Sequence, residues 1–115
     1  MIDEKQIQAI LEQYTKHGWS LRRVLLSAET EKNIAPEIFG QTEIVSFELD
    51  ALWFSRDANH ERETWELRSL SAVPFALVEV FEADDEDEVR EEARQEMQTQ
   101  MLERASKPVN KKVTG

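Results

Sequence analysis

Five polar residues that could do chemistry stand close together between two apolar runs: Asp57, Asn59, His60, Glu61 and Glu63. An imidazole with carboxylates could bind zinc or a similar ion, and a histidine beside acids could act as a general base. Only one His is present in the segment, however, and no Ser, Lys or Tyr stands beside it in a recognisable catalytic pattern. Asn and Asp are also residues that turns prefer. We therefore interpret the segment as a solvated hairpin turn and assign no catalytic, cofactor-binding or metal-ligating residue.

The rest of the sequence also lacks residues and motifs that are typical of catalysis or cofactor binding. The chain has no Cys, which excludes disulfides, thiolate nucleophiles and Cys-based metal sites. It has only three Gly, none in a phosphate-binding loop, and no metalloprotease or nucleophile-elbow pattern. The sequence therefore predicts no cofactor and favours a non-enzymatic protein.

The apolar runs on either side of the turn predict the two strands of an antiparallel hairpin. The loop length suggests a register in which the numbers of paired residues sum to about 118. This register places Trp53 opposite Trp65 and Asp50 opposite Arg68, and such aromatic and opposite-charge pairs stabilise a sheet. Asp50, Trp65 and Arg68 are also the nearest candidates for a ligand pocket between sheet and helices.

The first forty residues predict a helix, a further element and a turn. Apolar residues recur at helical spacing from Ile7 to Tyr14, and the pattern stops before Gly18. Residues 19–27, WSLRRVLLS, are compatible with a strand or a second helix, and we favour the strand. The polar AETEKN that follows predicts a loop, and APEIFG at 35–40 predicts one helical turn.

Residues 43–55 and 75–83 predict two strands that carry apolar side chains on both faces. One layer of helices can cover only one face of a sheet, so a monomer would expose the other face. The commonest cover is a second copy related by a twofold axis. The candidate interaction surface, which includes two methionines of the last helix, consists of Ile44, Leu52, Phe54, Val78, Val80, Met97 and Met101.

The C-terminal part predicts a long acidic helix that Asp84 or Asp85 could cap. Small or flexible residues recur every fourth position from Val89 to Ala105, and this thin stripe fits a helix that rests on the sheet or packs on another chain. Residues 106–115 are basic and poor in apolar residues, which predicts a disordered tail after a single domain at 1–105.

The charge of the chain argues against several kinds of partner. The formal net charge is -10, and the acids are concentrated between Glu79 and Glu96. Such a chain repels nucleic-acid phosphates and anionic lipids, so we expect neither nucleic acid nor membrane as a partner. Residues 1–13 mix charged and apolar side chains, unlike a signal peptide, and no apolar run is long enough to span a bilayer. A cytoplasmic protein is expected.

Together these patterns predict an α+β fold with an N-terminal helix, an antiparallel meander of about four strands and a long acidic C-terminal helix in two-layer packing. A small acidic protein with helices on an antiparallel sheet is similar in architecture to type III secretion chaperones, although it lacks the helix that those proteins insert within the sheet. The resemblance implies a cytoplasmic dimer that binds unfolded segments. The function that we expect is a homodimeric protein–protein interaction module. The alternatives are a secretion-chaperone-like binder and an enzyme or small-ligand binder with a pocket at the residues named above.

Overall fold

The computed structural model describes residues 3–71 and 75–106, without the side chain of Ser106. Its elements, in chain order, are α1 (Glu4–Lys16), β1 (Ser20–Leu26), α2 (Ala28–Asn33), η1 (Pro36–Phe39), β2 (Ile44–Ser46), β3 (Ala51–Asp57), η2 (Asn59–Glu61), β4 (Glu63–Ser69), β5 (Ala76–Phe81) and α3 (Asp87–Ser106). The predicted tail lies outside the described residues except for Ser106. Within the described residues, no helix combines the length and apolar character needed to cross a bilayer.

The strands form one five-stranded sheet in the order β2-β1-β3-β4-β5. β1, β3, β4 and β5 pair antiparallel, as the meander predicted, and the short β2 pairs parallel with β1. The α+β class is confirmed, with one strand more than expected.

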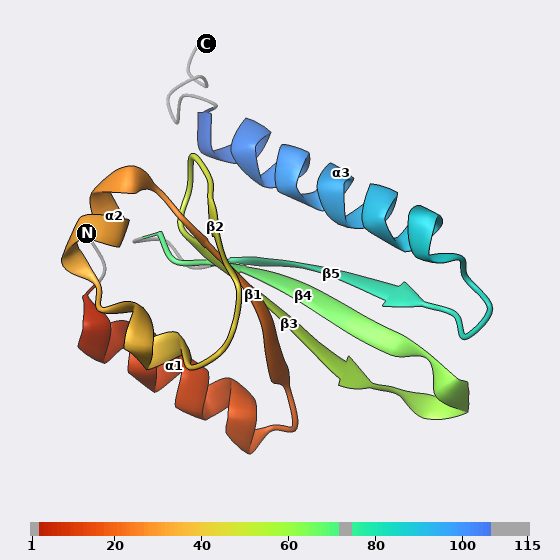
Figure 1. Ribbon diagram of the computed structural model, residues 1–115. Coiled ribbons are helices and arrows are strands. Elements are labelled where there is room, and N and C mark those ends of the chain that lie inside the picture. The colour runs from red at the N-terminus through yellow and green to blue at the C-terminus, as the bar shows by residue number, and fades with distance from the viewer. Residues whose placement is uncertain (1–2, 72–74, 107–115) are drawn as a thin grey trace, which may run out of the picture.

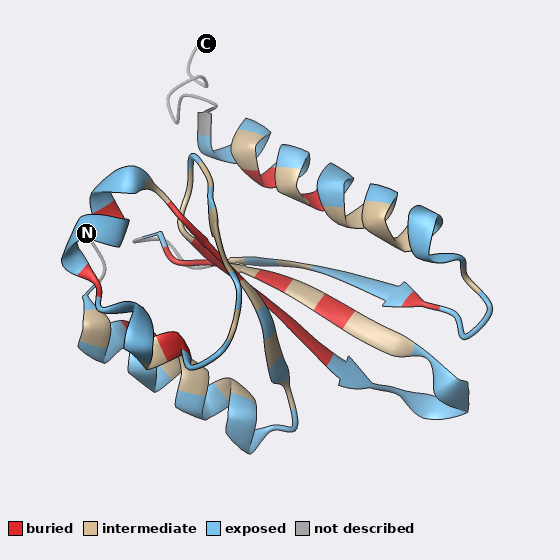
Figure 2. Cartoon of the chain, viewed as in Figure 1, coloured by how far each residue is buried: buried red, intermediate tan, exposed pale blue. Residues whose placement is uncertain are grey.

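The two long helices lie on opposite faces of the sheet (Figure 1), and each covers its own core. Successive residues of a strand point to opposite faces, and β3 therefore serves both cores. Leu52 and Phe54 pack beneath α1 with Ile7, while Trp53 packs beneath α3 with Met101. The buried residues accordingly run along the central strands (Figure 2). The packing has three layers, so the two-layer prediction is wrong.

The predicted strand at 43–55 is two strands on opposite sides of β1. β2 ends at Ser46, the Phe47 N–H donates to the Leu26 carbonyl at 2.9 Å, and the chain then crosses to begin β3 at Ala51. A strand inside a sheet needs hydrogen-bond partners along both edges, and the two halves of this segment supply both for β1. Alternation looks the same in one long strand as in two short ones, so the break is not visible in the pattern.

The segments that precede this crossing agree in part with the predictions made from the sequence. Residues 20–26 form a strand, which confirms the favoured alternative, and Pro36–Phe39 form the predicted helical turn, followed by Gly40 with φ 64°. The predicted loop AETEKN is instead the short helix α2. Ser27 caps it by accepting a hydrogen bond from the Thr30 N–H at 3.4 Å, and Thr30 is buried.

The β3–β4 hairpin is shifted by two residues from the predicted register. Trp53 pairs with Leu67 and Ser55 with Trp65, so the predicted Trp53–Trp65 and Asp50–Arg68 pairs are wrong. The Ala58 N–H donates to the Arg62 carbonyl at 2.8 Å, which places the turn one residue later than expected. A shift of two keeps every side chain on its face, and the rings of Trp53 and Trp65 still meet edge to face at 5.9 Å.

Candidate docking site at the β5 edge

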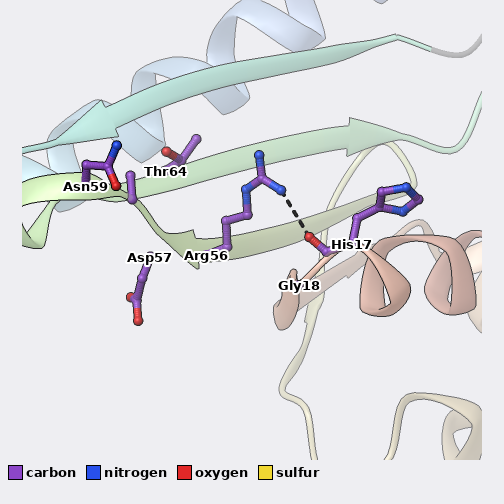
Figure 3. A pocket seen from close by; sticks show the side chains of 7 residues that line it. His17, Gly18, Arg56, Asp57, Asn59 and Thr64 are labelled. Atoms are coloured by element: carbon purple, nitrogen blue, oxygen red, sulfur yellow. Dashed lines mark hydrogen bonds between the residues drawn. The ribbon is translucent and has the colours of Figure 1, made fainter.

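The polar segment that first suggested chemistry is the exposed tip of the β3–β4 hairpin. Residues 57–62 are exposed, and an open hollow of about 510 Å³ beside them is lined by His17, Gly18, Arg56, Asp57, Ala58, Asn59 and Thr64. Arg56 donates to the His17 carbonyl at 3.0 Å (Figure 3) and lies over the Trp19 ring at 4.6 Å. Its guanidinium thus joins the end of α1 to the sheet. Across residues 3–71 and 75–106, no group of three His, Asp or Glu side chains is placed to share a metal ion.

The three candidate pocket residues lie in different surroundings. Asp50 accepts hydrogen bonds from the Ser27 N–H at 2.7 Å and the Thr30 hydroxyl at 2.6 Å, so it holds the start of α2. Trp65 lies on the α3 face of the sheet, and Arg68 lies on the α1 face and donates to the Ser69 carbonyl. Trp65 and Arg68 thus lie on opposite faces of the sheet.

The seven residues of the candidate interaction surface are divided between the faces of the sheet. Leu52 and Phe54 are buried beneath α1, and Ile44 packs against the same core. Met97 and Met101 are buried beneath α3 on the opposite face. Val78 and Val80 of β5 are exposed by 55% and 44%. The second face of the sheet is therefore covered by α3, and the exposed part of the predicted surface is on β5.

On the α1 face, the side chains of β4 are half-buried and those of Ala76, Val78 and Val80 on β5 are exposed. We call the region made by Thr64, Glu66, Arg68, Ala76, Val78 and Val80 the open half-face. Its residues pair across the two strands, Glu66 with Val78 and Thr64 with Val80, which gives a polar row on β4 beside an apolar row on β5. Figure 2 shows β5 as a largely exposed strand.

A fixed polar contact separates the open half-face from α1. The Tyr14 hydroxyl donates to the Glu66 carboxylate, and the Tyr14 ring stacks on Phe54 with centroids 4.0 Å apart. Burial and the neighbouring Glu66 carboxylate raise the pKa of the Tyr14 phenol well above its usual range. The hydroxyl therefore stays protonated and acts as a donor to Glu66 at neutral pH.

The backbone of β5 presents hydrogen-bonding groups at the edge of the sheet. The Ser69 N–H donates to the Phe75 carbonyl at 2.9 Å, and in an antiparallel ladder hydrogen-bonded and non-hydrogen-bonded pairs alternate. The N–H and C=O groups of Ala76, Val78 and Val80 therefore point away from β4. In the described part of the chain, β5 has β4 as its one strand neighbour, so this edge is open.

The α3 side of the same edge is a groove with an apolar floor and an acidic rim. A hollow of about 300 Å³ is lined by Leu77, Val78, Glu79, Ala93, Glu96, Met97 and Gln100. Glu79 and Glu96 are exposed, and neither makes an ion pair with a residue that the structure describes. The edge thus combines open backbone groups, exposed valines and two unpaired carboxylates.

Sequence reasoning found Val78 and Val80 but missed Glu79, Glu96 and the open edge. The last strand of a meander is an edge strand, and β5 carries one charged residue, Glu79, among apolar ones. These two signals could have indicated the site. No family model, curated protein or solved structure matches this chain, so its function is inferred from this geometry.

Proposed function

We propose that this protein is a non-enzymatic protein–protein interaction module that binds a partner by strand addition at β5. The observation that carries the proposal is the outward direction of the backbone groups of Ala76, Val78 and Val80 on a strand whose valines are exposed. An extended segment laid along this edge would gain main-chain hydrogen bonds, while pockets beside the strand select its side chains.

The composition of β5 supports a binding role for this edge. Natural proteins guard edge strands with Lys, Pro, bulges or inward-pointing charges, because an open edge is a template for another chain. β5 has neither Lys nor Pro, and Glu79 on the α3 side is its one charge of the kind that guards an edge. An extended partner also agrees with the binding of unfolded segments that the resemblance to secretion chaperones implies.

Self-association is the second candidate, and it would use the same edge. Ala76, Val78 and Val80 form a row that is nearly symmetric about Val78, so a twofold axis there would place Val80 of one copy beside Ala76 of the other. This homodimer would form through the strand edge, because α3 covers the face that the sequence suggested.

A valine pair of similar exposure tests the proposal. Val78→Lys places a charge on the open edge, whereas Val89→Lys changes a valine on α3 that is exposed by 50%. Affinity capture from a native lysate should retain a partner with wild type and Val89→Lys and lose it with Val78→Lys. Light scattering at micromolar concentration reports self-association in the same samples. Equal capture by all three proteins, together with a monomer mass, would contradict docking at β5.

A further inference from the structure

We infer that the strand docked on β5 is a cationic amphipathic segment, in which Lys or Arg alternates with apolar residues. This inference rests on the proposed function and names the chemistry of its partner. It follows from what lies on each side of the β5 edge.

The two faces of the sheet beside β5 favour different side chains in the added strand. Side chains of a strand alternate between the faces of the sheet. On the α3 side, one set would enter the groove whose floor includes Leu77 and Met97 and whose rim carries Glu79 and Glu96. On the opposite side, the other set would extend the apolar row of Val78 and Val80. A long cationic side chain suits the groove, because its stem packs on the floor and its charge reaches the carboxylates.

Charge favours such a segment over a second copy of this chain. If two β5 strands paired about a twofold axis at Glu79, the two Glu79 carboxylates would face each other directly, and like charges in that position destabilise a sheet. An axis at Val78 leaves them as diagonal neighbours about 7–8 Å apart. Either arrangement also brings each copy's Glu96 toward the same seam, between chains of net charge -10. A cationic segment turns these repulsions into attractions.

Two synthetic heptapeptides test the chemistry of the partner. One alternates lysine and valine, and the other replaces each lysine with glutamate. Titration of the full chain, followed by fluorescence anisotropy of the labelled peptide and by the amide chemical shifts of β5, should show binding of the lysine peptide with shifts at Ala76, Val78 and Val80. Val78→Pro, which removes an outward N–H without changing the charge, should abolish this binding while thermal melting shows a folded protein.

A matched pair of charge variants separates local recognition from bulk attraction. Glu79→Lys/Glu96→Lys should lower the affinity for the lysine peptide about tenfold or more, because two attractive contacts become repulsive. The same variant should raise the affinity for the glutamate peptide. Glu12→Lys/Glu48→Lys makes the same change in net charge at exposed positions away from β5, and should alter either affinity by less than about threefold.

The outcomes distinguish this inference from the proposed function. If wild type binds both peptides equally and Val78→Pro abolishes the binding of both, strand addition at β5 is supported and the inference of a cationic partner is contradicted. If the two charge variants weaken the lysine peptide equally, the attraction is non-specific and the inference is also wrong. A dimer that Val78→Pro dissociates would identify a second copy as the occupant. Binding that Val78→Pro leaves unchanged would contradict docking at the edge itself.

Discussion

Arginine side chains hold the acidic helix α3 on the sheet. Arg94 lies over the Trp65 ring at 4.4 Å and Arg104 over the Phe75 ring at 4.5 Å. A guanidinium over an aromatic face is attracted electrostatically, and its stem also covers apolar surface. Hydrophobic periodicity counts these residues as polar, so it underestimates how much of α3 faces the protein. The side chains of Arg90 and Arg94 are largely turned toward the protein, whereas Glu79 and Glu96 are exposed beside the β5 groove.

Tyr14 is the residue whose ionisation should be coupled to stability. Burial and the Glu66 carboxylate raise the pKa of its phenol above the ordinary value of about 10. The unfolded chain therefore releases this proton at a lower pH than the folded chain does. The stabilisation is fully present below pH ~10 and is lost as pH rises toward the folded pKa. We expect the free energy of unfolding to fall above pH ~10 by an amount that is missing in Tyr14→Phe.

Tyr14 is the only Tyr in the chain, so the phenolate absorbance reports its titration directly. Urea unfolding of wild type and Tyr14→Phe at several pH values measures the difference. Tyr14→Phe keeps the ring that stacks on Phe54, so at neutral pH it should cost only about 1–3 kcal/mol for the lost bond to Glu66. Phenolate formation at the ordinary pH in the folded protein would contradict the assignment.

At the scale of elements, α3 decides how the sheet is covered. Its stripe of small and flexible residues fitted either its own sheet or another chain, and the structure places it on its own sheet. Met97 and Met101 are buried there, while Val89, the residue that begins the stripe, is half exposed. Trp53 adds a hydrogen bond from its indole N–H to the Gln98 side chain at 2.9 Å. The helix thus packs on the core of its own chain.

This arrangement predicts that two side-chain truncations on α3 lower the free energy of unfolding by different amounts. Met101→Ala should lower the free energy of unfolding by about 2–5 kcal/mol, because it leaves a cavity beneath α3. Val89→Ala, at an exposed position, should change it by less than about 0.5 kcal/mol. Chemical denaturation at two protein concentrations measures both. A loss at Met101 that depends on protein concentration would show that α3 packs on another chain.

At the scale of the whole molecule, one sheet is shared by two cores, and β5 forms one of its two edges in the described part of the chain. α1 packs on the side chains of β1 and β3 and contacts β4 through the Tyr14–Glu66 hydrogen bond, while Ala76, Val78 and Val80 of β5 are exposed on the same face. α3 covers the other face. Val78 and Val80 of the last strand are exposed, and the docking proposal therefore rests on β5.

The domain should end with α3. Met101 is the last buried residue that the structure describes, and residues 107–115 are polar and basic apart from two Val, one Pro and one Gly. Deletion of 107–115 should leave the melting temperature unchanged, because a segment so poor in apolar residues adds little to a core. Calorimetry of the full chain and the truncated chain compares them. A drop of several degrees on truncation would place the boundary further along the chain.

Local patterns in the sequence determined most of the elements. Helical spacing predicted α1 and α3, apolar runs predicted β3, β4 and β5, and turn residues predicted the exposed hairpin tip. The segment of β1 was compatible with strand or helix, and the favoured strand is confirmed. These features depend on residues that are close together in the sequence, so the sequence alone can predict them. Of the predicted interaction surface, Val78 and Val80 are exposed, and both belong to the last strand of the sheet.

Only the tertiary structure decided which partner each apolar residue meets. The alternation of residues 43–55 is identical for one strand or two, and pairing with both edges of β1 splits it into β2 and β3. Leu52 and Phe54 are core residues because α1 lies above them, and Met101 is a core residue because α3 returns over the second face. Such contacts join segments far apart in the chain, and local periodicity carries no information about which of several apolar surfaces will cover another. The place of β5 at an edge of the sheet is likewise set by the pairing of the strands.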